Sequence, residues 1–317
     1  MSDLTELAPA RSRGMQMLEH EALLHDGTDC LVENVTPIVL ACVEAKRPVF
    51  VTLTEERLWA LRNAVDGRED RSVEWHETET WFPHPARRLR ALAERLSMPE
   101  VAVRRPLYVL EQPSPTGTAG IAPEWERLDA AMDVILSGLC ARVICTYDTA
   151  VLDPDRVARV GLCHRTGTVS RLSGTYAGGE ECLRSLATEL SRVPNHARSL
   201  EAPDPAAGRQ LARDAARSAS LDPLRSDDFA LAASEVVTNS LVHGRRPVSC
   251  HWWLDEHLLS YQVDDGGRGV LDPLAGYRSP PAGANQGRGL WLARQLVDSI
   301  EFDSSRGVSS VRLSVCV

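Results

Sequence analysis

Two oxygen-bearing side chains, Glu235 and Asn239, lie four residues apart in the last third of the chain. The stretch from Ser226 to His243 has apolar residues at three- and four-residue spacings, which predicts a helix with Ser226 as N-cap and Gly244 as stop. Side chains four positions apart share one face of a helix. A carboxylate and a carboxamide can therefore serve one small site, and such oxygens are the ligands that Mg²⁺ prefers.

A carboxylate beside glycines comes next, after a strand-like run from His257 to Val263. Asp265 closes this run, and Gly267 and Gly269 follow it closely. Glycines let the backbone turn tightly and approach a ligand closely. We therefore expect a ligand to meet the backbone at this strand end.

A third segment offers backbone amides instead of side chains. Gly287 and Gly289 precede a helical pattern from Leu290 to about Ser299. Free amides and the helix dipole make a helix start a ready site for phosphates. Alone, each of the three segments would more commonly be a solvated helix face or a plain turn. Their occurrence together and in this order favours a nucleotide site.

The three segments, in this order, resemble the N, G1 and G2 boxes of the GHKL (Bergerat) ATP-binding fold. They read Glu235-Val-Val-Thr-Asn239, Val263-Asp-Asp265-Gly-Gly267-Arg-Gly269 and Gly287-Arg-Gly289-Leu290. The resemblance implies ATP and Mg²⁺ as cofactors, with Mg²⁺ held by Asn239 and a water or hydroxyl activated by Glu235. It also implies that Asp265 accepts a hydrogen bond from the adenine amino group. The remaining ATP contacts would come from Gly267, Gly269, Gly287, Gly289 and Leu290.

Longer phrases narrow the resemblance. Residues 233–244 and 287–298 are similar to those of RsbW-type anti-sigma factor kinases, and the region from about Ala202 to Val317 is as compact as theirs. The resemblance implies a GHKL α/β sandwich, a sigma factor as partner, and a Ser or Thr of a STAS-type anti-sigma antagonist as phosphate acceptor. A sensor histidine kinase would instead need a two-helix dimerisation segment, where this chain has a Pro-, Ala- and Asp-rich stretch from Pro194 to Ala207.

The resemblance also implies a homodimer, because RsbW-type domains are similar to one another in pairing. A predicted helix from Arg209 to Ala219 carries a stripe of small and apolar residues. That stripe either packs against a twin or packs on the sheet of its own domain, where most amphipathic helices lie. Its members are Leu211, Ala212, Ala215, Ala216 and Ala219.

The N-terminal part of the chain alternates strand-like and helical patterns, which predicts an α/β layer with a mostly parallel sheet. In such sheets ligands bind beyond the carboxyl ends of the strands, here near Glu111 and Asp148. The strand-like runs cover residues 48–54, 106–111 and 141–147, and the helical patterns cover residues 31–45, 55–65, 86–96 and 124–139.

Four phrases in this part look like the MEDS sensory domain of RsbA-family anti-sigma regulators: His20 to Leu24, Phe82 to Arg87, Glu111 to Pro113, and Cys145 to Asp148. The resemblance implies a RecA-like α/β layer without a phosphate loop. The sequence agrees, because a phosphate loop needs a lysine after its second glycine, and Lys46, the single lysine, has no glycine run before it.

A sensory pocket for a small molecule of unknown chemistry is expected in this domain, with His84, Arg87, Glu111 and Asp148 as candidates. The alternative is that prolines beside His84 set a rigid turn and that Arg87 pairs with a surface carboxylate.

Composition bounds the remaining function classes. The chain has 317 residues, which allows two domains with cores of their own. A net charge of −9 and a pI near 5.5 argue against direct nucleic-acid binding. No signal peptide follows Met1 and no apolar run could span a bilayer, so we expect a cytoplasmic protein that does not enter a membrane.

The cysteines do not predict a disulfide or a metal site. No two of the eight have CxxC spacing, and several lie in apolar runs, so we expect buried, reduced thiols. Cys163 is next to His164, but no second pair of ligands follows them in sequence. Neighbours on a strand also point to opposite faces.

The sequence therefore predicts a two-domain α/β protein: a MEDS-like sensory domain at 1–197, a linker at 198–206 and a GHKL ATP-binding domain at 207–317. Its predicted function is a cytoplasmic anti-sigma regulator of transcription in a stress response, which binds ATP-Mg²⁺ and a sigma factor and phosphorylates an antagonist. One alternative is a module that binds ATP and the sigma factor without catalysis. Another is an orphan histidine kinase.

Overall fold

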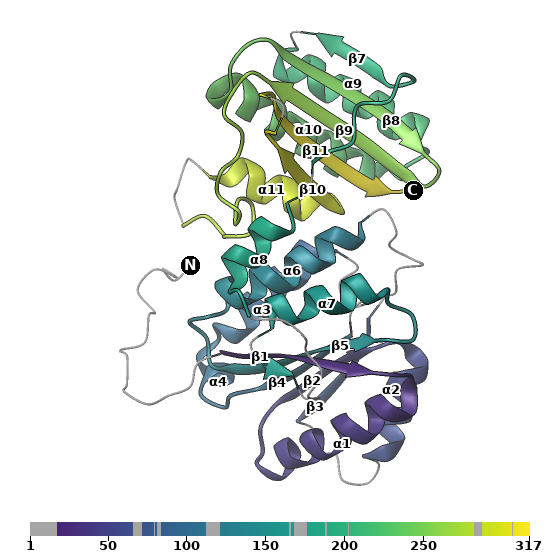
Figure 1. Ribbon diagram of the computed structural model, residues 1–317, viewed down its shortest axis with the longest axis vertical. Helices are drawn as coiled ribbons and strands as arrows, with labels where there is room; N and C mark the ends of the chain where they lie inside the picture. Colours follow the sequence, from purple (N-terminus) through teal and green to yellow (C-terminus); the bar gives the residue numbers. More distant parts are fainter. Residues whose placement is uncertain are drawn as a thin grey trace. The chain divides into compact units, whose positions relative to one another are not determined.

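The computed structural model of the chain (Figure 1) describes residues 18–65, 72–78, 80, 84–111, 121–164, 166–167, 176–187, 189–201, 203–281, 287–305 and 307–317. Backbone contacts divide the chain into two compact units, with the boundary between Cys182 and Leu183. Within the described residues, no helix is both long enough and apolar enough to cross a membrane.

The N-terminal unit is built on a six-stranded sheet in the order β3-β2-β4-β5-β1-β6, in which all pairs are parallel. Helices α1 and α2 cover one face, and α3, α6 and α7 cover the other (Figure 1). The strands are β1 (Leu18–His25), β2 (Val49–Leu53), β3 (Val73–Glu77), β4 (Leu107–Glu111), β5 (Ala141–Asp148) and β6 (Thr166–Gly167). The helices are α1 (Thr28–Glu44), α2 (Glu55–Ala64), α3 (Pro85–Leu96), α4 (Pro99–Ala102), α6 (Ala122–Ile135), α7 (Pro154–Cys163) and α8 (Gly179–Ser185).

This unit confirms the predicted parallel α/β layer. The three strand-like runs are β2, β4 and β5, and the helical patterns are α1, α2, α3 and α6. Strands β1 and β3 lie outside the predicted runs. Strand β1 is the more informative of the two, because it carries His20, Glu21 and His25 although it lies inside the sheet between β5 and β6. The search for apolar runs did not find this strand because of its polar residues.

The C-terminal unit is a five-stranded antiparallel sheet in the order β10-β11-β9-β8-β7. Helices α9 and α10 cover one face (Figure 1), and their apolar side chains share a core with β8, β9 and β11. This arrangement confirms the predicted GHKL α/β sandwich. The elements are β7 (Arg198–Glu201), α9 (Pro205–Ser218), α10 (Pro223–His243), β8 (Val248–Asp255), β9 (Leu258–Asp265), α11 (Arg288–Leu296), β10 (Ser299–Asp303) and β11 (Ser309–Cys316).

Both long helices begin earlier than predicted, because an Asp-Pro pair caps each of them. The side chain of Asp222 accepts hydrogen bonds from the amides of Leu224 and Arg225, each at 3.0 Å, so α10 starts before Ser226. Asp204 accepts one from Ala207 at 2.7 Å in α9. Proline at the first helical position lacks only an amide that has no partner inside the helix. A cluster of Pro, Ala and Asp that resembles a linker is therefore a helix start.

The predicted linker at 198–206 needs a correction for the same reason. Residues 198–201 form β7, which pairs with β8 in the register Arg198↔Trp252 to Glu201↔Ser249, and α9 begins at Pro205. The contact boundary also lies earlier, after Cys182. A four-residue edge strand has too few residues to show a periodic pattern, so its pairing was not visible in the sequence.

Residues before β7 also belong to the C-terminal unit. Arg312 on β11 is 7% exposed. Its guanidinium donates to the Ser191 hydroxyl at 2.9 Å, to the Ser191 carbonyl at 2.6 Å and to the Gln262 side chain at 2.7 Å. The amide of Leu190 donates to Asp303 at 2.9 Å.

The small-residue stripe of α9 is buried inside its own unit. Ala212, Ala215 and Ala216 are fully buried and Ala219 is 3% exposed, and all four belong to the core beneath the sheet. Of the two predicted partners for this stripe, the structure supports the domain's own core. A homodimer would need another surface.

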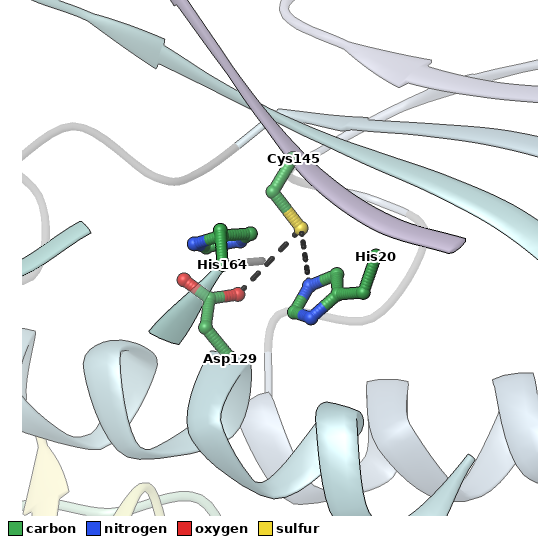
Figure 2. Close-up of side chains that lie close together, drawn as sticks. All are labelled: His20, Asp129, Cys145 and His164. Atoms are coloured by element: carbon green, nitrogen blue, oxygen red, sulfur yellow. Dashed lines mark hydrogen bonds between the residues drawn. The ribbon is translucent and has the colours of Figure 1, made fainter. Parts of the chain in front are cut away.

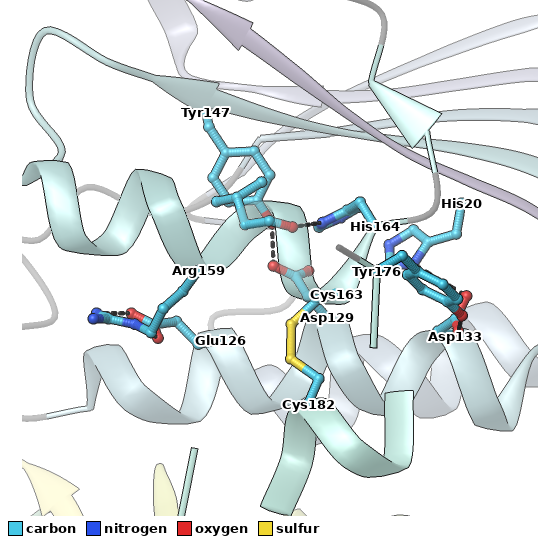
Figure 3. The surroundings of a disulfide bond; sticks show 11 residues. His20, Glu126, Asp129, Asp133, Tyr147, Arg159, Cys163, His164, Tyr176 and Cys182 are labelled. Atoms are coloured by element: carbon cyan, nitrogen blue, oxygen red, sulfur yellow. Dashed lines mark hydrogen bonds and ion pairs between the residues drawn. A yellow bond between two sulfur atoms is a disulfide. The ribbon is translucent and has the colours of Figure 1, made fainter. Parts of the chain in front are cut away.

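The expectation that all cysteines are reduced is wrong for one pair. Cys163 at the end of α7 and Cys182 in α8 form a disulfide, with Cα atoms 5.8 Å apart (Figure 3). The two lie 19 residues apart in sequence, so local spacing could not reveal them. The other six cysteines form no disulfide: Cys30, Cys42, Cys140, Cys145, Cys250 and Cys316.

The attachment of residues 183–201 to the C-terminal unit can be tested with two fragments, 183–317 and 203–317. The shorter one loses β7 and leaves the buried Arg312 guanidinium without Ser191. Because each lost hydrogen bond contributes about 0.5–1.5 kcal/mol, we expect the shorter fragment to be less stable by about 2–4 kcal/mol in urea denaturation. Equal unfolding midpoints would show that residues 183–201 do not contribute to the stability of the C-terminal unit.

Candidate nucleotide-binding site

A pocket of about 820 Å³ in the C-terminal unit lies where the end of α10, the turn after β9 and the start of α11 meet. Every cofactor-binding residue that the sequence predicts lines it: Asn239, Asp265, Gly267, Gly269, Gly287, Gly289 and Leu290. The predicted catalytic residue, Glu235, lies one helical turn before Asn239 on α10.

Asp265 sits at the last position of β9 and is 5% exposed. Its Oδ1 accepts hydrogen bonds from the amides of Gly267 at 2.7 Å and Arg245 at 3.4 Å. A Cβ atom at Gly267 would come within 2.6 Å of that oxygen, and one at Gly244 within 2.5 Å of the carboxylate carbon. These glycines therefore hold the carboxylate in place by backbone contact alone.

The second carboxylate oxygen, Oδ2, takes no hydrogen bond from the part of the chain that the structure describes. Since Asp265 lines the pocket, this oxygen can accept a hydrogen bond from a ligand donor. An amino group on a planar base is such a donor.

Glu235 and Asn239 both lie against the first turn of α11. A Cβ atom at Gly289 would be 2.9 Å from Glu235 Oε2 and 3.2 Å from Asn239 Nδ2. A side chain at 289 would displace the ends of these two side chains, so glycine leaves them in place beside the first turn of α11. The arrangement places two oxygen-bearing side chains next to the amides that begin α11.

The start of α11 offers those amides to a ligand. Gly287 is its N-cap, with a left-handed φ of 82°, and it supplies no side-chain cap to the helix. The first amides of the helix therefore lack the partner that a Ser or Asp cap would provide. Together with the helix dipole they form a site for phosphate oxygens.

Three arginines that sequence reasoning missed also line the pocket: Arg245, Arg268 and Arg278. Two aspartates, Asp265 and Asp272, oppose them, so the charged lining is positive overall. Guanidinium groups bind phosphate oxygens with paired hydrogen bonds. The sequence offered a partial signal, because Arg245 and Arg268 flank the predicted helix stop and the G1 glycines.

Comparison with known proteins agrees with this geometry. Residues 201–315 match the family model of the histidine kinase-like ATPase domain, and residues 19–165 match that of MEDS, the methanogen/methylotroph, DcmR sensory domain. The chain thus combines an N-terminal MEDS domain with a C-terminal ATPase domain of the GHKL type. Such a domain implies ATP binding, typically with Mg²⁺, and the pocket fits both.

A solved structure that is similar to part of the chain is that of the mycobacterial sensor histidine kinase MprB. Its sequence identity is 14%, the match covers 38% of this chain and 96% of that chain, and the TM-score is 0.27. No curated protein matches the chain.

In the MEDS domain, the structure brings two of the four predicted pocket residues together. Glu111 and Asp148 lie at the carboxyl ends of β4 and β5, and Arg57 of α2 forms an ion pair with each carboxylate. Glu111 also accepts a hydrogen bond from the Thr54 amide at the start of α2. Arg57 was not predicted. Its partners Glu111 and Asp148 lie 54 and 91 positions further along the chain, and nothing in the pattern of its own helix indicates them.

His84 and Arg87 belong to the start of α3, where His84 is the N-cap and Pro85 the first helical residue. This position fits the alternative in which a proline sets the local turn. The neighbouring Arg88, which is 1% exposed, donates to the Glu111 carbonyl at 3.2 Å. The phrases at residues 82–83 and 112–113 lie outside the described residues.

Burial alone would raise the pKa of Asp148, but the Ala150 amide and the Arg57 guanidinium outweigh it and hold that pKa below its usual value. Asp148 is therefore ionised, and Arg57 is the shared ion-pair partner of Asp148 and Glu111 at this edge of the sheet. A cationic small molecule could pair with the carboxylates of Glu111 and Asp148, and an anionic one could pair with Arg57.

The role of Asp265 can be tested with Asp265→Asn, which presents an amide where an acceptor is expected. Loss of a charge-assisted hydrogen bond costs about 1.5–3 kcal/mol, so the affinity for ATP should fall about ten- to hundredfold in calorimetric titration. The matched control is Asp264→Asn on the same strand, whose carboxylate bonds to Gln262 and Ser310. Unchanged affinity in Asp265→Asn would remove this residue from adenine recognition.

The Arg57 bridge predicts a pH-dependent stability. Arg57→Met leaves two buried carboxylates unpaired, which costs about 3–5 kcal/mol at pH 7. Because Asp148 has a lowered pKa in the folded state, its contribution is full above the unfolded value of about 3.9 and is lost as the pH falls through the folded value. The stability difference between wild type and Arg57→Met should therefore shrink below about pH 4.

Urea denaturation across pH 3–7 measures this difference. Arg62→Met, an exposed position on the same helix, serves as control. A difference that does not change with pH would show that Arg57 acts through packing instead of charge.

Proposed function

We propose that this protein is a cytoplasmic anti-sigma regulator whose C-terminal domain binds ATP-Mg²⁺ and a sigma factor. Its reaction is transfer of the γ-phosphate of ATP to a Ser or Thr of a STAS-type anti-sigma antagonist. The proposal is supported by the RsbW-like phrases of the sequence and by one observation above all. Glu235 and Asn239 lie together beside Gly289, at the amides where the phosphates of ATP would bind.

In this reaction Glu235 accepts the proton of the acceptor hydroxyl as that oxygen bonds to the γ-phosphorus. The bond between the γ-phosphorus and the bridging oxygen breaks, and ADP leaves with that oxygen. Bound Mg²⁺ supplies neutralisation of charge on the phosphate oxygens, and Asn239 is the side chain that would hold it. The arginines of the lining, Arg245, Arg268 and Arg278, orient the same oxygens.

A second function within the same domain is a module that binds ATP and the sigma factor without catalysis. The half-buried Glu235 favours the kinase, because Gly289 keeps its carboxylate next to the phosphate-binding amides.

An orphan histidine kinase is less well supported. His196, the histidine nearest before the ATPase domain, is exposed and lies 3.3 Å from the carboxylate of Asp255, the last residue of β8. It lies in a turn that the Ala197 amide closes on the Pro194 carbonyl at 3.0 Å, just before β7, and the described part of this region contains no two-helix segment.

The MEDS domain would supply the input. A small molecule bound near Arg57, Glu111 and Asp148 would alter ATP affinity, phosphotransfer or sigma binding only if its affinity differs between two states of the protein. A coupling of about 1 kcal/mol would change those quantities severalfold. Pairing of two chains remains part of the proposal, although the α9 stripe is buried in its own core.

Glu235→Gln tests the catalytic step. The variant keeps the shape of the side chain but removes the base, so phosphotransfer should be abolished while the dissociation constant for ATP and the melting temperature stay near wild type. The measurement is transfer of labelled γ-phosphate to an antagonist captured from cell lysate on the full chain, with and without ATP, and identified by mass spectrometry. Glu256→Gln, at an exposed position after β8, is the matched control.

The outcomes separate the candidate functions. Transfer that persists in Glu235→Gln removes this residue from the mechanism. Capture of a sigma factor without phosphotransfer by the wild-type chain would support the silent module, and an acid-labile phosphohistidine on the chain itself would support a histidine kinase.

A further inference from the structure

Four buried side chains with metal-binding chemistry converge in the MEDS domain (Figure 2). They are His20 of β1, Asp129 of α6, Cys145 of β5 and His164, which follows α7. Each is at most 4% exposed. One ligand atom from each lies within 4.8 Å of those of the other three. The set comes from four elements, so it is a product of the fold and not of a local motif.

The separations approach those of a tetrahedral metal site. His20 Nε2 lies 3.4 Å from Cys145 Sγ, and that sulfur lies 3.7 Å from Asp129 Oδ1. Zinc binds sulfur at about 2.3 Å and nitrogen or oxygen at about 2.0–2.2 Å, which places tetrahedral ligand atoms about 3.3–3.6 Å apart. The widest separation in the cluster exceeds this by about 1 Å, a gap that small side-chain rotations close.

Surrounding groups orient the ligands as they do around zinc in other proteins. His164 Nδ1 lies 2.9 Å from the Val160 carbonyl, so it carries the proton and leaves Nε2 with a lone pair. That Nε2 is buried and has no hydrogen-bond partner among the described residues. The hydroxyl of Tyr147 donates to Asp129 Oδ2, while Oδ1 is the oxygen near Cys145.

His20 has a comparable arrangement. Its Nε2 contacts the Cys145 sulfur, and its Nδ1 lies 3.9 Å from Asp133 Oδ1 and takes no hydrogen bond from the described residues. A small rotation that brings Nδ1 to Asp133 would form a carboxylate–histidine–metal triad. Asp133 is itself held by a hydrogen bond from the Tyr176 hydroxyl.

Charge balance favours a divalent ion at this place. A thiolate and a carboxylate with two neutral imidazoles carry a charge of −2, which an ion of charge +2 cancels, so the buried site becomes neutral.

We propose that His20, Asp129, Cys145 and His164 bind one Zn²⁺ ion that ties β1, β5, α6 and the end of α7 together. All four positions are protein side chains and all are buried, which is the pattern of a structural site and not of a catalytic one. A nucleophilic role for the Cys145–His20 pair has no support, because Cys145 has no solvent exposure through which a substrate could reach it.

Metal content and cobalt spectroscopy of the full chain, without nucleotide, test the site. We expect one zinc per purified chain. After removal of zinc, titration with Co²⁺ alone should give one tight site with thiolate-to-cobalt charge-transfer absorption and the visible bands of tetrahedral cobalt. Cys145→Ser should lose the charge-transfer band and bind at least about a hundredfold more weakly, and His164→Gln should weaken binding similarly. Asp133→Asn, a positioning change, should weaken it about ten- to hundredfold while the band remains.

Controls separate this site from other thiols. Cys140→Ser removes a free, half-buried thiol just before β5, and Cys163→Ser with Cys182→Ser removes the neighbouring disulfide. Both should keep the cobalt spectrum of the wild type. Far-ultraviolet circular dichroism shows whether each variant is folded, and His164→Gln decides the question if Cys145→Ser is not.

Absence of a stoichiometric metal together with no charge-transfer band in the cobalt titration would overturn the proposal. A band that survives in Cys145→Ser, or unchanged affinity in folded His164→Gln, would do the same. The cluster would then be a buried hydrogen-bond network. None of these outcomes depends on whether the C-terminal domain is a kinase.

Discussion

The nucleotide site depends on close approach of backbone to side chain at two glycine contacts. Gly289 brings the first turn of α11 against Glu235 and Asn239, and Gly267 brings the turn after β9 against Asp265. At both places a single methyl group would meet an oxygen at less than 3.0 Å, which forces side chains or backbone to move. The two glycines leave room for these polar groups, and the amides of Gly267 and Arg245 hold the Asp265 carboxylate in place. The arginines of the lining and the first amides of α11 can bind phosphate oxygens together only when α10, β9 and α11 lie this close to one another.

The sequence was sufficient for the parts of this site that are local. Glu235 and Asn239 share a helix face whatever the rest of the chain does, and glycines after a strand predict a turn in any context. The sequence was insufficient where partners come from far away. Arg57 pairs with carboxylates on two other elements, and β7 is a strand only because β8 lies beside it. The helix start at Asp204-Pro205 was predicted to be linker because the same residue types serve both purposes.

The polar residues of β1 show the same limit in the MEDS domain. An apolar pattern could not predict a strand that contains His20, Glu21 and His25, yet this strand lies between β5 and β6 inside the sheet. Its register with β5 pairs Ala22 with Cys145 and His25 with Asp148. Buried polar groups in a central strand are costly unless they have partners. Such partners come from other elements of the fold, as Cys145 of β5 does for His20.

That register also relates the two polar centres of the MEDS domain to each other. Cys145 and Asp148 are three residues apart on β5, and Tyr147 between them donates to Asp129 of the buried cluster. A strand in a packed sheet is too rigid to let one of these positions move far without the other. A ligand that separates Arg57 from Asp148 would therefore act on a segment whose other end is fixed by the cluster. A metal bound there would fix the position of β5 at Cys145. A change at Arg57 would then displace the residues around Asp148 and not the whole strand. Without one, part of that change would be absorbed by the repacking of buried polar side chains. If both proposals hold, the buried centre would supply rigidity and the edge of the sheet would supply the response to a ligand.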